Sequence, residues 1–354
     1  MNTKNKVNVG VIGLGMMGLT HLKVYDQLEN VNIVAIADLD PKKLNGETYA
    51  KGNIEGQAQT GVDFSNIKKY QDGFDLIKDK EIDFVDICIG THLHHEMAMA
   101  VFKENKHFLI EKPLARNYME ALTIVEQAKQ AKIFSMSAMC IRFWPGWTWV
   151  KNAIVNENYG KLLSLNLRRV ASHPGGDFYS NGDQCGGALL DLHVHDTDFV
   201  NFCLGVPDAV FSRGYSKNTS EIDHVLTQYI YNDTTKPQQV FAEGSWAMAE
   251  GFDFQMTYTA NFENATVIYS FDGHDQIMLY QQGKEPQKIE VESGMGYEHE
   301  IRHAINSILD KKTTDIESLK QAAQSLAIIE AEKKSIDRCQ IEKVNLAPIS
   351  SSCQ

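Results

Sequence analysis

The sequence lacks long apolar runs, tracts of basic residues and paired cysteine spacings. No uninterrupted apolar stretch approaches the roughly 20 residues needed to cross a bilayer. Its 34 basic residues are outnumbered by 46 acidic ones, which gives a net charge of −12. Without a basic tract, nucleic acid and anionic membranes are poor partners. We therefore expect small-molecule partners.

The cysteines show no C-x-x-C and no regular spacing, which excludes a disulfide framework and favours reduced thiols in a cytosol. They are Cys88, Cys140, Cys185, Cys203, Cys339 and Cys353. Lys4 and Lys6 precede an apolar stretch, as in a signal peptide, but the glycines and the lack of a small-residue cleavage site indicate a buried strand and turn. We expect a soluble, cytoplasmic protein. Its 354 residues, 43% of them hydrophobic, leave room for two domains.

The motif G-x-G-x-x-G follows the β-branched run 7–12 and comprises Gly13, Gly15 and Gly18. An apolar-periodic segment with Leu22 and Tyr25 comes next, so the order is strand, tight turn, helix. A pyrophosphate gains there from close backbone N–H groups and from the positive end of the helix dipole. The pattern predicts a dinucleotide site; the alternative is a glycine-rich turn that holds no nucleotide.

A second apolar run, 33–37, ends in Asp38, about twenty residues beyond the last glycine. A carboxylate there accepts hydrogen bonds from a ribose 2′-OH and repels a 2′-phosphate, which favours NAD. Lys42 and Lys43 lie just downstream and leave NADP open.

The rhythm of the chain predicts an α/β protein whose two halves differ. Strands at 84–89, 107–110 and 133–139 alternate with helices at 96–104 and 118–132, which indicates a doubly wound parallel sheet. Beyond residue 140 strands follow one another, with a helix near 189–204, which indicates a mostly antiparallel sheet in an α+β domain. We expect its strands at 162–170, 225–231, 239–248, 252–262, 265–271 and 276–281, and closing helices at 298–309 and 316–338.

Two stretches carry candidate chemistry. Glu111-Lys112-Pro113 ends a predicted parallel strand, where such folds bind ligands, although a lysine before a proline is often only solvated. Asp191, His195 and Asp198 follow a glycine pair and share one stripe of a predicted helix. A carboxylate beside an imidazole suits proton transfer near neutral pH; a surface ion pair is the equally weighted alternative.

Two further clusters are less specific. The run 142–149 holds Arg142 and three tryptophans, which suit either a sugar ring or packing between domains. The histidines form two close groups, but nothing in the sequence fixes their convergence on a zinc ion, so we expect no metal. These histidines are His92, His94, His95, His193 and His195.

Together the glycine motif, Glu111-Lys112-Pro113 and Gly186-Gly187 leading to Asp191, His195 and Asp198 resemble the glucose-fructose oxidoreductase, inositol dehydrogenase and MocA (Gfo/Idh/MocA) family over nearly the whole chain. The resemblance implies a Rossmann domain at 1–139 and, at 140–354, an α+β domain with a large open sheet for substrate binding and homodimer or homotetramer contacts. It also implies NAD(P)-dependent oxidation or reduction of sugars, cyclitols and their derivatives.

Carried over to this sequence, the family pattern implies catalytic roles for Lys112, Asp191 and His195. It places the cofactor against Gly13, Gly15, Met16, Met17, Gly18, Asp38, Ile89, Gly90, His94, Glu111 and Lys112. One departure is that Ile89-Gly90 stands where the family commonly has Thr-Pro. Candidate substrate contacts are Arg142, Trp144, Arg169, His173 and Asp177.

The mechanism we expect passes a substrate hydroxyl proton to His195, since an imidazole pKa of about 6.5 suits that task. Asp191 orients the substrate or the imidazole, and Lys112 polarises the developing carbonyl oxygen. Two rival functions are an NAD-dependent, glycosidase-like hydrolase that uses transient oxidation and a non-catalytic nucleotide-binding redox sensor.

Overall fold

The computed structural model describes residues 6–47, 61–271 and 274–347. The chain divides into two compact units, one made of residues 1–140 and 296–323, the other of residues 141–295 and 324–354. The division expected at residues 139 and 140 differs from this, because the chain returns to the first unit, where α11 (Gly296–Leu309) packs against α1 (Met16–Asp26). Cys353 lies outside the described residues, and no described cysteine forms a disulfide.

The first unit is built on a six-stranded sheet in the order β3-β2-β1-β4-β5-β6, and all its pairings are parallel. Its strands are β1 (Val7–Ile12), β2 (Val31–Ala37), β3 (Lys68–Tyr70), β4 (Phe84–Ile87), β5 (His107–Glu111) and β6 (Ser135–Ala138). The order reverses between β1 and β4, which is the place where doubly wound folds bind dinucleotides. The predicted parallel sheet is confirmed.

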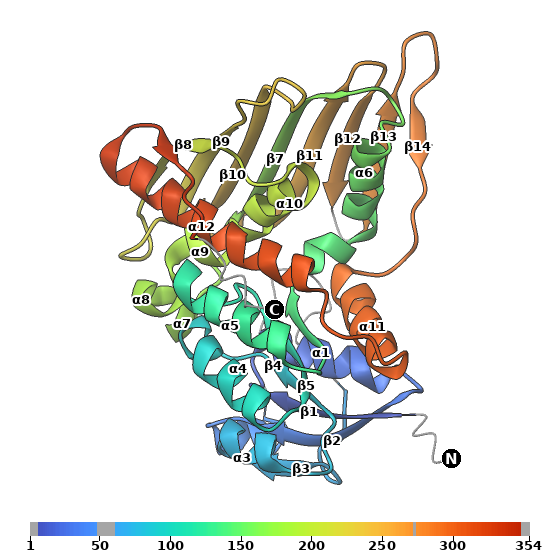
Figure 1. Ribbon diagram of the computed structural model, residues 1–354, viewed down its shortest axis with the longest axis vertical. Helices are drawn as coiled ribbons and strands as arrows, with labels where there is room; N and C mark the ends of the chain where they lie inside the picture. Colours follow the sequence, from blue (N-terminus) through green and yellow to red (C-terminus); the bar gives the residue numbers. More distant parts are fainter. Residues whose placement is uncertain (1–5, 48–60, 272–273, 348–354) are drawn as a thin grey trace. The chain divides into compact units, whose positions relative to one another are not determined.

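Helices accompany this sheet (Figure 1), most of them in the stretches between its strands. They are α1, α2 (Pro41–Leu44), α3 (Gly73–Lys78), α4 (His94–Lys103), α5 (Tyr118–Gln130) and α11. α5 begins where it does because the Asn117 side chain accepts a hydrogen bond from the N–H of Glu120, as the predicted cap requires. β4 and β6 are buried on both faces, as expected for a parallel sheet covered by helices.

The second unit is built on a nine-stranded sheet in the order β14-β13-β12-β11-β7-β10-β9-β8-β15. Its strands are β7 (Leu162–Ser172), β8 (Ala209–Tyr215), β9 (His224–Ile230), β10 (Gln239–Met248), β11 (Gln255–Phe262), β12 (Thr266–Phe271), β13 (Asp275–Tyr280), β14 (Gln287–Ile289) and β15 (Glu342–Lys343). Only the β7–β10 pairing is parallel, so the predicted mostly antiparallel sheet is confirmed.

Alternating burial along β9, β11 and β12 gives this sheet one buried and one accessible face. The helices that accompany it in Figure 1 are α6 (Pro145–Val155), α7 (Asp177–Ser180), α8 (Gly182–Cys185), α9 (Gly187–Asp191), α10 (Val194–Leu204) and α12 (Ile316–Arg338), of which the part from residue 324 belongs to this unit. Among the described residues, no helix combines the length and apolar character needed to cross a membrane.

Candidate active site

The glycine loop between β1 and α1 has the shape of a pyrophosphate cradle. A Cβ at Gly13, whose φ is +93°, would collide with the Cys88 carbonyl, and one at Gly18 would collide with the Gly13 carbonyl, so packing requires both glycines. A Cβ at Gly15 would meet nothing within 4 Å. Gly15 caps α1 without a side-chain hydrogen bond, and Met16 and Met17 form the first turn of that helix. These residues fit a dinucleotide at the helix N-terminus.

Asp38 lies at the same loop. Its Oδ2 accepts the N–H of Leu14 at 2.7 Å, and its Oδ1 accepts the N–H of Asp40 at 2.9 Å. Lys43 Nζ lies 3.3 Å from Oδ2 in an ion pair. The carboxylate is therefore held at the end of β2 beside the glycine loop, where the spacing in the sequence predicts it.

His94 joins the loop after β4 to the turn after β5. Its Nδ1 lies 2.8 Å from the Pro113 carbonyl oxygen, and its Nε2 lies 3.0 Å from the carbonyl oxygen of Ile89, next to Gly90. Burial lowers the pKa of His94, and a neutral imidazole donates to only one of these carbonyls. The predicted cofactor contacts of Ile89, Gly90 and His94 stay predictions, while the bonds of His94 are to protein carbonyls.

Lys112 follows the last residue of β5 and is part-exposed between buried Glu111 and buried Pro113. The Glu111 side chain turns inward and accepts the backbone N–H of Lys112 on Oε2 at 3.0 Å. The Lys112–Pro113 peptide is cis. The predicted cofactor contact of Glu111 stays untested, and the contacts observed for its carboxylate are with Lys112 and His21.

The segment 185–201 is buried at every position except Asp191, Leu192 and His195. The prediction of a single helix at 189–204 is wrong, because α9 ends at Asp191 and α10 begins at Val194. Asp198 does not share an accessible stripe with Asp191 and His195, since it is 1% exposed and bonded to Arg142. A carboxylate and an imidazole thus remain accessible on either side of the helix break.

His193, which carried no role in the sequence analysis beyond the histidine cluster, lies inside this break and is fully buried. Its Nε2 lies 3.4 Å from Glu332 Oε2 and 3.4 Å from the Tyr229 hydroxyl. A Cβ at Gly244 of β10 would lie 2.6 Å from His193 Nδ1. The imidazole therefore fills the space above a strand that has no side chain at that position. Gly187, with φ +70°, is similarly required by packing, because a Cβ there would collide with the Ile222 carbonyl.

Arg142 and Arg169 are buried in ion pairs of the second unit. Arg142 Nε and Nη2 donate to Asp198 at 2.8 and 2.7 Å, and Arg169 Nε and Nη2 donate to Asp196 at 2.9 and 3.1 Å. Their predicted substrate contacts stay predictions, but the observed contacts are structural.

The tryptophan run packs within the second unit. Trp144 Nε1 donates to Asp275 at 2.9 Å, and Trp147 is fully buried with its ring edge-on to Phe199 and Tyr258. The contacts observed for these two rings are with residues of the second unit. The predicted substrate contact of Trp144 is also untested.

His173 and Asp177 lie on the segment after β7. The His173 ring packs edge-on against Trp246, its Nε2 lies 3.2 Å from the Tyr179 carbonyl oxygen, and its Nδ1 accepts the Gly175 N–H. Asp177 is exposed at the start of α7. Asp177 has the exposure that a substrate contact needs, and both roles remain predictions.

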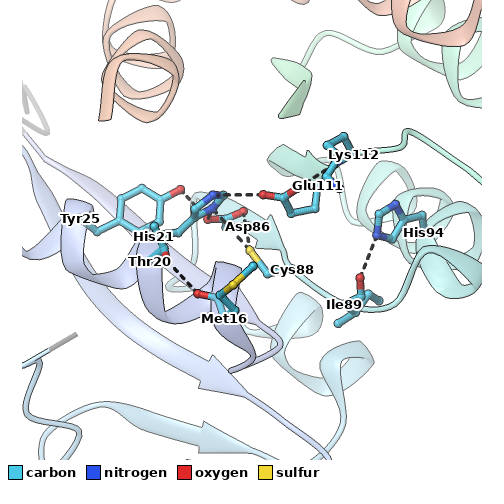
Figure 2. A network of polar contacts seen from close by, with 10 residues as sticks. All are labelled: Met16, Thr20, His21, Tyr25, Asp86, Cys88, Ile89, His94, Glu111 and Lys112. Atoms are coloured by element: carbon cyan, nitrogen blue, oxygen red, sulfur yellow. Dashed lines mark hydrogen bonds and ion pairs between the residues drawn. The ribbon is translucent and has the colours of Figure 1, made fainter. Parts of the chain in front are cut away.

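A buried polar network next to Lys112, which links His21, Asp86 and Glu111, was not predicted from the sequence (Figure 2). His21 Nδ1 lies 2.8 Å from Asp86 Oδ2, which also accepts the Tyr25 hydroxyl at 2.8 Å. His21 Nε2 forms an ion pair with Glu111 Oε1 at 3.3 Å, although its geometry falls short of a hydrogen bond. The signal in the sequence was a histidine four residues before Tyr25, on the same helix face as that buried ring.

Within the described residues, one group of three side chains has its possible metal-ligand atoms close together, namely His21, Asp86 and Cys88. The histidines at 92–95 and 193–195 form no such group there. In that set Cys88 Sγ lies 3.5 Å from both His21 Nδ1 and Asp86 Oδ1, so the atoms contact one another. Burial raises the pKa of the Cys88 thiol, which keeps it protonated and a poor ligand.

Two family models match this chain. Residues 7–138 match the oxidoreductase family, NAD-binding Rossmann fold, and residues 147–273 match the GFO/IDH/MocA C-terminal domain. The first unit thus contains an NAD-binding Rossmann fold.

Curated relatives and solved structures agree with these matches. The chain is 29% identical over 210 residues to myo-inositol 2-dehydrogenase of Thermotoga maritima and 30% identical over 210 residues to levoglucosan dehydrogenase of Pseudarthrobacter phenanthrenivorans. These alignments cover 59% and 58% of this chain, and only 58% and 53% of the relatives. The fold is similar to that of a levoglucosan dehydrogenase in complex with NADH and levoglucosan, with a TM-score of 0.81, 20% identity, and coverage of 96% of this chain and 100% of that one.

Proposed function

Because this chain belongs to the Gfo/Idh/MocA family, we propose that it is an NAD-dependent dehydrogenase acting on a CH–OH group of a sugar, cyclitol or sugar derivative. The observation that carries the proposal is the exposure of three side chains. Lys112 is part-exposed between two buried residues, and Asp191 and His195 are part-exposed in an otherwise buried segment. The inositol and levoglucosan dehydrogenases among the relatives support the substrate class.

In the proposed reaction His195 accepts the substrate hydroxyl proton while the adjoining carbon loses a hydride. Asp191 orients the substrate or the imidazole. The Lys112 ammonium stabilises negative charge on the oxygen as it becomes a carbonyl, and the same groups act in reverse during reduction. The nicotinamide, when bound, accepts the hydride. Gly15 leaves room for the pyrophosphate, while Gly13 and Gly18 let the loop and the helix pack closely beside it.

Asp38 supports NAD over NADP, because its carboxylate repels a 2′-phosphate. Lys43, 3.3 Å from Asp38, offsets part of that charge and keeps NADP as the alternative. Comparing turnover with the two cofactors in the parent and in Asp38→Ala tests this. We expect the variant to lose preference for NAD; an unchanged preference would contradict the assigned role.

The accessible face of the nine-stranded sheet is the interface we propose for a homodimer or homotetramer. Strand register aligns one row across it, from Phe211 through Gln228, Phe241, Asn166, Thr259 and Ile268 to Met278. All are at least part-exposed, and the row mixes apolar and polar groups as interfaces do. Light scattering after Phe241→Lys and Ile268→Lys should report smaller particles than the parent gives.

We also propose a cytoplasmic location, because the spacing of the cysteines in the sequence does not suggest disulfide pairs.

The decisive experiment is NADH formation from NAD⁺ with a panel of inositols, levoglucosan, free sugars and nucleotide sugars. For the substrate that reacts, Lys112→Met and His195→Asn should each lower kcat by about 10²- to 10⁴-fold. Asp183→Asn, an exposed change in α8, serves as the control and should leave kcat at the parent value.

Each rival function predicts a different result. A leaving group released without net NADH would identify the hydrolase that uses transient oxidation. NADH binding without turnover of any substrate would favour the redox sensor. Parent-like kcat in His195→Asn would refute the proton-transfer role.

A further inference from the structure

Below Lys112 the first unit buries more acidic than basic groups. Asp86 is fully buried on β4, Glu111 is 6% exposed at the end of β5, and Glu300 is fully buried on α11. The imidazole of His21, on α1, is fully buried and lies between the carboxylates of Asp86 and Glu111 (Figure 2). A buried carboxylate without a counter-charge is costly, so His21 is the group that makes this arrangement tolerable.

The titratable groups that face His21 explain its charge. Burial opposes the charged form most strongly, but the carboxylate of Asp86 holds the pKa of His21 well above its usual value. Tyr25 donates to Asp86 from the same helix, and burial, followed by the charge of Glu111, keeps the pKa of Glu300 high. His21 is therefore an imidazolium at neutral pH, with one ring nitrogen toward each carboxylate.

The contacts of Glu111 connect this charge to Lys112. Oε1 of Glu111 faces His21 at 3.3 Å, while Oε2 accepts the backbone N–H of Lys112 at 3.0 Å. The carboxylate thus divides its two oxygens between the buried imidazolium and the peptide from which the Lys112 side chain leaves. A displacement of His21 releases one oxygen and lets the other rotate away from that peptide.

We propose, resting on the function proposed above, that His21 is a positioning residue for Lys112: it holds the Glu111 carboxylate against the Lys112 backbone N–H and so sets the direction of the Lys112 ammonium. His21 touches neither substrate nor cofactor in this account. Its effect belongs to the transition state, where a misplaced ammonium stabilises the developing oxygen charge less well.

Two variants of similar shape separate the two faces of the imidazole. His21→Gln places an amide where Nε2 is, next to Glu111, whereas His21→Asn places one where Nδ1 is, next to Asp86. With the reacting substrate, we expect His21→Asn to lower kcat by about tenfold to a hundredfold and to leave KM and the NADH dissociation constant within about threefold of the parent. His21→Gln should retain more of the parent kcat than His21→Asn.

Ser135→Ala is the matched control for loss of a buried polar contact in the same unit, because the Ser135 hydroxyl bonds Thr314 at 2.8 Å and has no link to Lys112. It should lower the melting temperature and keep the parent kcat. Equal kcat in both His21 variants and the parent, or kcat losses that follow melting temperature in all three variants, would overturn the inference.

A second measurement needs no substrate. Reductive methylation with ¹³C-formaldehyde gives each lysine an NMR signal, and Lys112→Arg identifies the one from Lys112. In His21→Asn that signal should shift and its titration midpoint should move, with a smaller change in His21→Gln; an unchanged signal would overturn the inference. A changed signal in a protein that forms no NADH from any substrate would instead refute the proposed function alone.

Discussion

In the second unit each buried arginine faces one buried aspartate through two donor–acceptor contacts, whereas in the first unit one buried histidine faces two carboxylates with a third nearby. The pairs Arg142–Asp198 and Arg169–Asp196 balance their charges within themselves. The His21 network does not, and it extends to the backbone of Lys112. Balanced pairs support the architecture, while the unbalanced network is connected to a candidate catalytic group.

The largest effect we expect comes from breaking a balanced pair. Asp196→Ala leaves Arg169 buried and uncompensated, which should lower the free energy of unfolding by about 3–5 kcal/mol in urea denaturation. The double variant Arg169→Met, Asp196→Leu removes both charges and should recover most of that loss. If Asp196→Ala had the same unfolding free energy as the parent, the Arg169–Asp196 pair would not be buried away from solvent as it is in the structure.

Removing a hydroxyl from each unit compares the two environments directly. Tyr25→Phe deletes a hydrogen bond to the Asp86 carboxylate and should cost about 1.5–3 kcal/mol of unfolding free energy. Tyr231→Phe deletes a bond to the Gly205 carbonyl at 2.9 Å and should cost about 0.5–1.5 kcal/mol. The reverse order in denaturation experiments would contradict the charged state of the network.

The pH dependence of stability isolates Glu300. Burial, with the charge of Glu111 next, raises its pKa in the folded state well above 4.5, so above pH 4.5 the folded chain holds a proton that the unfolded chain has lost. Stability should therefore fall as pH rises from about 4.5 toward the folded pKa, at up to about 1.4 kcal/mol per pH unit for this proton.

Glu300→Gln keeps a neutral side chain of the same shape and should flatten that decline. His21, whose folded pKa is also raised, adds a loss of the same sign that begins only above about pH 6.5. A decline as steep in Glu300→Gln as in the parent would mean that Glu300 does not carry the proton.

The smallest effect belongs to an ion pair at the surface of the sheet, where Arg168 also donates to the Gln255 side chain. Arg168 Nε donates to Glu243 at 2.9 Å on the accessible sheet face, where the side chains are 37% and 26% exposed. In the dissociated subunit, Arg168→Met should change the unfolding free energy by less than about 1 kcal/mol, because solvent screens such pairs. A loss as large as that of Asp196→Ala would remove the distinction between buried and exposed pairs.

Local patterns predicted much of the fold. The strand 239–248 and the helix 316–338 have the predicted bounds, and Asp38 lies beside the glycine loop as its spacing requires. β8 and β14 were missed, since both depend on pairing with neighbouring strands rather than on a strong pattern of their own. The break at Leu192 was missed because the apolar spacing continues through it.

Partners distant in sequence explain the rest. Arg142 and Arg169 were candidates for substrate contact, and nothing in a local pattern indicates that Asp198 and Asp196 lie against them. The same holds for His21, whose carboxylate partners are on two different strands. Which lysine, aspartate and histidine are exposed was likewise visible only in the folded units.

Gly244 of β10, which has no side chain, determines how closely the segment with Asp191 and His195 packs on the sheet. Strand β10 offers bare backbone at Gly244, and the His193 ring occupies that clearance. A larger residue at Gly244 would displace the His193 ring, and with it the candidate groups Asp191 and His195 on either side. Under the proposed function, a substitution at this position would change turnover without replacing a candidate catalytic side chain.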